Sequence, residues 1–296
     1  MTPRVHRIAA LTVAAGLCWS GVAAAQAPVV QDGIAVKPLP SYRVLASEEQ
    51  LERDAAQQYS ALMTSAREKQ ALVPPNDPQL IRLRAIARRL IPYTARWNPA
   101  AAKWDWQINL LASKQVNAFC MPGGRIAFYT GIISALSLTD DEIAAIMGHE
   151  ITHALREHGR ERMVKSTGTD LAARLLGAGA AAYFGVDPRL ADSAARQAGQ
   201  LVVLKFSRDD EREADLVGLD LAARAGYDPR AGVAVWQKMA ALGKRQPLEF
   251  MSTHPSGADR IERINANMHL LLPLYARARG VPQAQLPAYR STALPN

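Results

Sequence analysis

The chain has little cysteine, few aromatic residues and no internal hydrophobic run long enough to be a membrane span. Two cysteines occur among 296 residues, and 6% of the residues are aromatic. If the N-terminal segment that contains Cys18 is removed, Cys120 remains alone, and an intrachain disulfide is excluded. A core of this size does not need disulfides, so the composition is compatible with export to an oxidising compartment.

The most apolar internal stretch, residues 171–185, contains Arg174 and falls short of the roughly 20 apolar residues that a transmembrane helix needs. We predict that it forms helices packed over the core, without insertion into a membrane. The formal net charge is +8, but no basic run with neighbouring aromatics occurs, so nucleic-acid binding is not predicted. Solvated helix faces account for the charge, and weak contact with anionic lipid heads is the alternative.

Residues 1–25 have the pattern of a secretion signal: a short basic start, an apolar segment and three alanines that end at Ala25. We predict cleavage after Ala25 and export to the periplasm. A buried N-terminal helix is the alternative interpretation. Cys18 follows Leu17 instead of a small residue, so no lipid anchor is expected at Cys18.

The rest of the chain divides into an extended lead-in (26–45), one domain (46–275) and a loosely ordered tail (276–296). Helical spacing recurs along the domain, without an internal repeat. Alternating segments predict three strands, at 106–110, 117–121 and 125–129. We predict an α+β architecture, mostly helical with a small sheet of about three strands. The sequence makes no prediction of oligomeric state.

The segment H-E-I-T-H at 149–153 carries the clearest chemical signal. Thr139 can begin a capping box, which predicts that the segment lies on a helix. His149 and His153 are then one turn apart on one face, so both imidazoles can reach one Zn²⁺. Glu150 is rotated by about 100° from His149, where it can accept a proton from zinc-bound water. Two surface histidines near a glutamate are the alternative.

A second predicted helix, from Ser207 to its C-cap at Gly226, offers a third ligand. A zinc site in a peptidase usually has three protein ligands and one open position. Glu211 and Asp215 are four residues apart on one face of this helix. One can bind the ion while the other accepts the N–H of a ligating histidine. A solvated acidic helix start is the alternative.

These motifs resemble the M48 family of zinc metallopeptidases, a group of gluzincins. The resemblance rests on four segments in the family's order: 117–131, 149–153, 207–215, and the C-terminal pair 225–229 and 253–255. It covers about residues 50–275. Cys120 departs from the small aliphatic residue usual in relatives, which puts little in doubt for catalysis. The transmembrane pair and tetratricopeptide repeats of some relatives are not found.

The resemblance implies a zincin-like (gluzincin) catalytic domain with one Zn²⁺ per chain. His149, His153 and Glu211 would be the zinc ligands, Glu150 the general base, and Asp215 would orient one of the two histidines. The protein would hydrolyse polypeptides, in particular misfolded exported envelope proteins. A zinc-containing chaperone with absent or suppressed proteolysis is the alternative. Glu150 favours the enzyme, because zinc binding alone does not need it.

His254 and Arg260 are further candidates for the catalytic site. His254 could stabilise an oxyanion or occupy the open position of the zinc, and a structural hydrogen bond is the alternative. Arg260 could steady developing charge or pair with Asp215, with a helix-start salt bridge as the alternative. His158 and His269 are predicted to be surface residues, since His158 lies off the ligand face of a continuous helix.

The predicted hairpin around 122–124 is a candidate for substrate binding. We predict that the strand at 125–129 is an edge strand that pairs with an extended peptide through main-chain hydrogen bonds. The glycine pair would let the backbone approach closely. An ordinary hairpin turn is the alternative, and the resemblance favours substrate binding. The predicted substrate-binding residues are Asn117, Pro122, Gly123, Gly124, Ile126 and Phe128.

Overall fold

The computed structural model describes residues 32–39, 41, 45–166, 206–245, 248–254 and 258–294. The predicted secretion signal and the apolar stretch 171–185 lie outside these residues. Along the described ranges the helices are α1 (Glu48–Glu68), α2 (Pro78–Leu90), α3 (Thr130–Ala135), α4 (Asp140–Leu155), α5 (His158–Ser166), α8 (Arg208–Arg224), α9 (Ala231–Gly243), α10 (Glu249–Thr253), α11 (Ala258–Ala266) and α12 (Met268–Arg279). Short 3₁₀ helices are η2 (Ile91–Arg96), η3 (Pro99–Lys103) and η4 (Gln283–Gln285). In this part of the chain, no helix has both the length and the apolarity required to cross a bilayer.

Three strands form one mixed sheet in the order β1-β3-β2. β3 (Arg125–Tyr129) pairs in parallel with β1 (Gln107–Leu111) and antiparallel with β2 (Ala118–Met121). β3 is therefore the central strand, and both of its main-chain edges are hydrogen bonded. The prediction that residues 125–129 form an edge strand is wrong, because β3 inserts between β1 and β2 and leaves these two strands at the edges of the described sheet.

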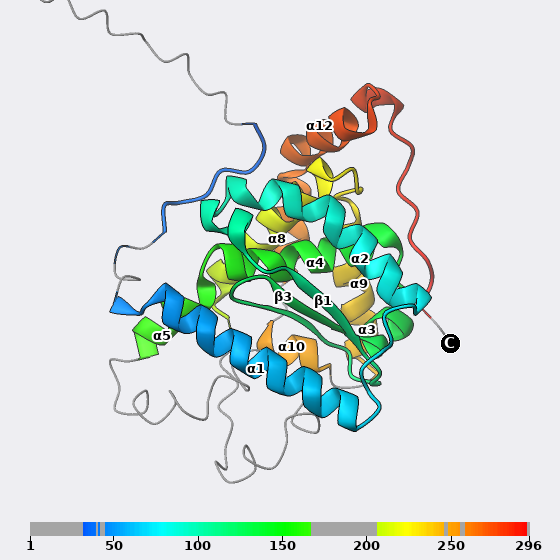
Figure 1. Cartoon of the computed structure of the whole chain (residues 1–296). Helices are drawn as coiled ribbons and strands as arrows, with labels where there is room; N and C mark the ends of the chain where they lie inside the picture. The colour runs from blue at the N-terminus through cyan, green and yellow to red at the C-terminus, as the bar shows by residue number, and fades with distance from the viewer. Residues whose placement is uncertain are drawn as a thin grey trace, which may run out of the picture. The chain divides into compact units, whose positions relative to one another are not determined.

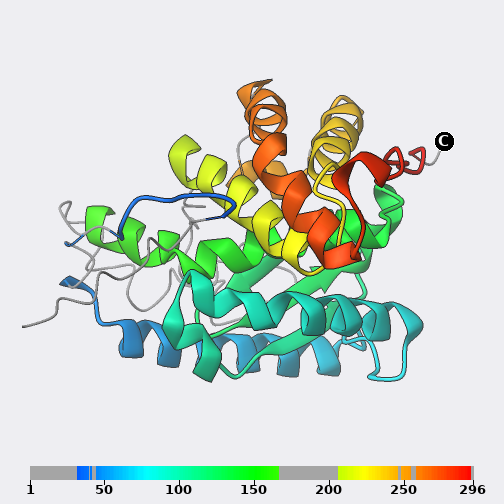
Figure 2. The ribbon, with the colours of Figure 1, turned by 90° about the horizontal axis from the view of Figure 1, so that it is seen from above.

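Helices cover both faces of this sheet, as expected for an α+β domain in which strand side chains alternate between two apolar layers. Tyr59 of α1 packs with Phe119 and Tyr129 on one face. Ile126 and Phe128 point to the other face, into the core shared with α2 and α4. Figures 1 and 2 show α1, in blue, on one side of the sheet and α4 and α8, in green and yellow, on the other.

α4 is the central helix of the larger layer, and 14 of its 16 residues are buried. It begins with the predicted capping box, in which the Thr139 N–H donates to Glu142 Oε2 at 2.9 Å. Glu142 is fully buried and also accepts a hydrogen bond from Lys238 Nζ at 2.7 Å. A buried charge of this kind needs such a partner, so the ion pair stabilises the start of α4.

Both ends of the described chain are bound to the domain. The Ile34 N–H donates to Asp220 of α8 at 2.9 Å, and Ile34 is buried. Ser291 Oγ donates to Glu142 at 2.5 Å. Segments predicted as an extended lead-in and a loosely ordered tail thus contain residues with specific partners in the domain. Composition could not show this, because the partners lie far away in the sequence.

α4 and α8 approach each other at two glycines. A methyl group on Gly148 would lie 2.4 Å from the Gly218 carbonyl oxygen, and one on Gly218 would lie 2.5 Å from the His149 nitrogen. The obstacles are backbone atoms, which cannot rotate away as a side chain can. Any larger residue must therefore push the two helices apart. This contact fixes the separation between the H-E-x-x-H segment on α4 and Glu211 on α8.

We predict that Gly218→Ala lowers the free energy of unfolding by about 1–3 kcal/mol, as overpacking of a protein core typically does. Denaturant unfolding of the purified protein measures this change. Gly243→Ala is the matched control, because its new methyl group would meet only Leu248, at an ordinary 3.8 Å. The control should be as stable as the wild type or slightly more stable, and equal stability of the two variants would contradict the glycine contact.

Candidate metal centre

Three side chains converge where α4 crosses α8. The Nε2 atoms of His149 and His153 are 3.1 Å apart. The Glu211 carboxylate lies 3.6 Å from His149 Nε2 and 3.5 Å from His153 Nε2. All three residues are buried, with at most 4% of their surface exposed. The structure thus brings together the two histidines and the carboxylate that the sequence singled out. Within the described ranges, these three residues and His254 form a group whose ligand atoms all lie within 4.8 Å of one another.

The donor set fits a zinc ion. Two imidazole nitrogens and one carboxylate oxygen are the ligands of many catalytic zinc sites. Burial lowers the pKa of His149 and lowers that of His153 further, so the neutral imidazole is the favoured form of both. The neutral form is the one that binds a metal ion. The two inward-facing nitrogens are therefore suited to coordinate a divalent cation.

Asp215 supports His149 from behind. Its Oδ1 lies 3.1 Å from His149 Nδ1, the ring nitrogen that points away from the centre. Trp236 Nε1 donates to the same oxygen at 3.2 Å. Burial acts to raise the pKa of Asp215, but Arg260 and His149 outweigh it and lower this pKa to about 2. The carboxylate thus stays ionised and can orient the imidazole. The sequence left open which of the two histidines Asp215 contacts. In the structure that histidine is His149.

Arg260 links the two acidic residues of α8. Its guanidinium donates to Asp215 Oδ1 at 2.6 Å and to Glu211 Oε2 at 2.5 Å. It also lies 3.5 Å above the ring of Trp236. Pairing with Asp215, one of the roles considered for Arg260, is therefore present. The arginine compensates the buried negative charge of both carboxylates, which would otherwise be costly.

Glu150 is 2% exposed and lies beside the converging donors. Its Oε1 has no hydrogen-bond partner within the described part of the chain, and the nearest imidazole, that of His254, is 3.6 Å away. A buried carboxylate oxygen without a partner is rare. Burial raises the pKa of Glu150 to about 8, and a divalent cation nearby would oppose this rise. The free oxygen is suited to accept a proton.

His254, at the end of α10, completes the group. Its Nδ1 is 3.0 Å from Glu211 Oε1 and 3.2 Å from His149 Nε2. The ring stacks between Phe206 and Phe250, at centroid distances of 5.2 and 4.3 Å. Burial disfavours its charged form, but the Glu211 and Glu150 carboxylates outweigh burial and raise the pKa of His254. The sequence did not predict the two phenylalanines, which show no spacing pattern that would connect them with this histidine.

His158 is not the surface residue that the sequence predicted. It is 2% exposed, and its Nδ1 lies 3.0 Å from Nδ1 of His153. The prediction was wrong because it assumed a continuous helix, on which a residue five positions beyond His153 points elsewhere. In the structure α4 ends at Leu155, and Glu157 has a φ of 55°, so the chain turns back before α5. His269 is exposed, as predicted.

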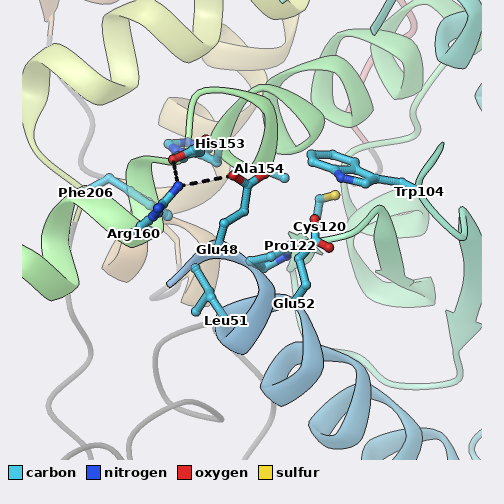
Figure 3. A pocket seen from close by; sticks show the side chains of 12 residues that line it. Glu48, Leu51, Glu52, Trp104, Cys120, Pro122, His153, Ala154, Arg160 and Phe206 are labelled. Carbon is cyan, nitrogen blue, oxygen red and sulfur yellow. Dashed lines mark hydrogen bonds and ion pairs between the residues drawn. The ribbon is translucent and has the colours of Figure 1, made fainter. Parts of the chain in front are cut away.

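A hollow of about 460 Å³, open in part to solvent, lies beside His153 (Figure 3). Its lining surface is mostly apolar. Leu51 of α1, Pro122 just after β2 and Phe206 just before α8 are among the residues that line it. Arg160 forms ion pairs at its border, with Glu157 at 2.7 Å and with Glu48 at 3.3 Å. One predicted substrate-binding residue, Pro122, therefore borders an accessible space next to the candidate ligands.

The other predicted substrate-binding residues have structural roles in the hairpin. Gly123 and Gly124 both have positive φ, 78° and 82°, which the turn requires. A methyl group on Gly124 would also lie 2.7 Å from the Trp106 ring. Ile126 and Phe128 are fully buried in the central strand and cannot pair with a peptide through their main chain. Asn117 is buried just before β2, where its side chain accepts the Ala118 N–H at 3.0 Å.

Comparisons with known proteins agree with this geometry. The chain is 36% identical over 156 residues to the mitochondrial metalloendopeptidase OMA1 of Arabidopsis thaliana, covering 53% of this chain and 30% of that protein. It is 32% identical to the metalloprotease LoiP of Escherichia coli, covering 53% of this chain and 60% of LoiP. It is 25% identical to the beta-barrel assembly-enhancing protease of Yersinia pestis, covering 62% and 38%.

The chain thus spans between 30% and 60% of the length of these three relatives. Residues 81–268, more than half of the chain, match the family described as Peptidase family M48. The matched range includes all four residues of the converging group, with the two histidines on α4, the glutamate on α8 and His254 after α10. On this match, which agrees with the three-stranded sheet and the donor set, the chain belongs to peptidase family M48.

Proposed function

We propose that this protein is a zinc-dependent endopeptidase. The observation that carries the proposal is the unpartnered carboxylate oxygen of Glu150 beside the converging side chains of His149, His153 and Glu211. His149, His153 and Glu211 would hold the ion. Zn²⁺ in such a site acts as a Lewis acid that polarises a carbonyl group and makes water nucleophilic near neutral pH. Relatives named metalloendopeptidases and proteases support the same activity.

Glu150 would move the protons in this reaction. Its free Oε1 accepts a proton from the attacking water and returns it to the amine that leaves the cleaved peptide bond. Burial raises its pKa to about 8, and a bound cation would oppose this rise, so the balance suits a group that must both accept and donate a proton. Asp215 and Arg260 act indirectly, since they hold His149 and Glu211 in place.

We propose that the polypeptide substrate lies along β2. This strand is at an edge of the described sheet and packs against α4, which carries the candidate ligands. Main-chain pairing with an extended peptide gives binding with little sequence selectivity. Asn117 and the turn from Pro122 to Gly124 flank β2 and would lie at the two ends of the bound segment. The hollow beside His153 offers space for one substrate side chain.

We further propose that the enzyme acts in the periplasm on misfolded envelope proteins. The predicted secretion signal and the relative named beta-barrel assembly-enhancing protease support this location. Other relatives are named as mitochondrial enzymes, so the location needs a direct test. Cell fractionation should find the protein, shortened by the first 25 residues, in the periplasmic fraction. A protein that keeps residues 1–25 and is found in the cytoplasmic fraction would contradict the proposed location.

We predict that Glu150→Gln retains one zinc ion per chain but loses at least about 100-fold in turnover, the lower end of what general-base catalysis contributes. Metal analysis and cleavage of a casein-like substrate measure the two properties. Glu262→Gln, a change at an exposed glutamate, is the control and should behave as the wild type. Unimpaired turnover of Glu150→Gln would refute the base assignment. A wild type that binds zinc without cleaving would favour the chaperone alternative.

We predict that Glu211→Gln weakens zinc binding at least about 100-fold, because it removes the only anionic donor of the proposed ligand set. Competition with a chelating dye gives the dissociation constant. Asp209→Asn is the control, since Asp209 lies in the first turn of the same helix but its side chain is 91% exposed. A full zinc content of Glu211→Gln at low free zinc would count against Glu211 as a ligand.

His254 is proposed as a fourth donor that competes with water for the open position. Its Nδ1 faces the same centre as the other donors, at 3.0 Å from Glu211 and 3.2 Å from His149. We predict that His254→Ala retains zinc and cleaves faster than the wild type, because one coordination position becomes permanently available. Initial rates at equal zinc occupancy measure this. A slower variant would instead favour the oxyanion role, and unchanged activity with unchanged zinc coordination would exclude both roles.

A further inference from the structure

The two candidate ligands on α4 differ in what holds the outer side of each ring. His149 has Asp215 at 3.1 Å from its Nδ1. His153 has another histidine there, because its Nδ1 is 3.0 Å from Nδ1 of His158. The two rings meet edge to face, with centroids 5.0 Å apart and planes at 74°. This contact has no role in the activity proposed above, and both histidines are almost fully buried.

The positions of the ring protons follow from the chemistry. A histidine that binds a metal through Nε2 must carry its proton on Nδ1, so Nδ1 of His153 is a donor. Nδ1 of His158 must then be the acceptor, which leaves the proton of His158 on its Nε2. Nε2 of His158 faces Glu213 Oε2 at 3.9 Å. This distance is longer than a direct hydrogen bond but places a negative charge beside the N–H of His158. Each N–H of the series then points away from the centre.

Glu213 is itself held in position. Arg156 pairs with Glu213 through its Nε, and its Nη2 donates to the Lys37 carbonyl at 2.6 Å. Arg156 is buried, with 6% of its surface exposed. Glu213 lies between the metal ligand Glu211 and Asp215 on α8. This stretch of helix therefore brings Glu211 to the ion site, Asp215 directly to His149, and Glu213 to His158, which in turn contacts His153.

We propose, on the basis of the zinc site proposed above, that His158 is a positioning residue that holds the zinc ligand His153 through an Nδ1–H···Nδ1 hydrogen bond, with Glu213 aligning His158. Outer partners of this kind fix the tautomer and the orientation of a ligating imidazole. Without the acceptor, the buried N–H of His153 has no partner, and the ring is free to turn its Nε2 away from the ion.

The test is the zinc affinity of the purified full chain. His158→Phe keeps a ring in the space but removes the acceptor, and we expect the zinc dissociation constant to rise 10–100-fold. His158→Asn places its Oδ1 close to the former position of Nδ1, so it should restore most of the affinity. Glu213→Gln should give an intermediate loss. His269→Phe changes an exposed histidine and serves as the control.

A second readout separates positioning from a general loss of structure. The absorption bands of the cobalt-substituted protein report ligand geometry, and they should shift in His158→Phe but not in the control. If His158→Phe does not fold, as judged by thermal unfolding of the metal-free protein, Glu213→Gln and His158→Asn still decide the question. In that case the proposal requires a weaker affinity in Glu213→Gln and a nearly normal affinity in His158→Asn.

Several outcomes would overturn the proposal. Wild-type affinity in His158→Phe, together with lost affinity in Glu211→Gln, would remove the role of His158 while the zinc site stands. An equal loss in His158→Asn and His158→Phe would mean that ring shape matters and hydrogen-bond acceptance does not. A wild-type chain that binds no zinc would refute the proposed function itself, which is a different result.

Discussion

The close crossing of α4 and α8 is the constraint on which the site depends. Gly148 and Gly218 let the two backbones meet, so the histidines of one helix and the carboxylate of the other face a common centre. Both helices are held at their starts by capping boxes. The ligands come from segments more than fifty residues apart, and the centre exists only once these helices have packed. Binding of the proposed ion would therefore be coupled to folding of this domain.

The site concentrates ionisable groups in a buried space, and their mutual pairing makes this tolerable. Glu211 and Asp215 share Arg260, whose guanidinium is 3% exposed. Removing one member would leave another charge buried and unpaired, at a typical cost of 3–5 kcal/mol. At present Arg260 and His254 offset the negative charges of Glu211 and Glu150. A divalent cation at this place would add further positive charge. The network can thus accommodate the positive charge of the proposed ion.

The sequence predicted those features that depend on neighbouring residues. The capping box at Thr139, the spacing of His149 and His153 and the left-handed glycine at 226 are local patterns, and the structure contains each of them. The predictions from sequence failed for features that are set by contacts between residues far apart in the chain. Which strand lies in the centre depends on the pairing of β3 with β1, and the position of His158 depends on a backbone turn at Glu157. Neither has a periodic signature.

Residues 32–39, the first described segment, form a strap that matters if the chain cleaves polypeptides as proposed. An endopeptidase that accepts extended chains must keep its own extended segments out of its cleft. Residues 32–39 have no regular structure, yet Ile34 is tied to α8 and the Lys37 carbonyl to Arg156 at the end of α4. A segment tied at both places cannot adopt the free, strand-like form that the proposed pairing with β2 would require. Under the proposed activity, the contacts that brace the site would also keep the strap from being cleaved by the protein itself.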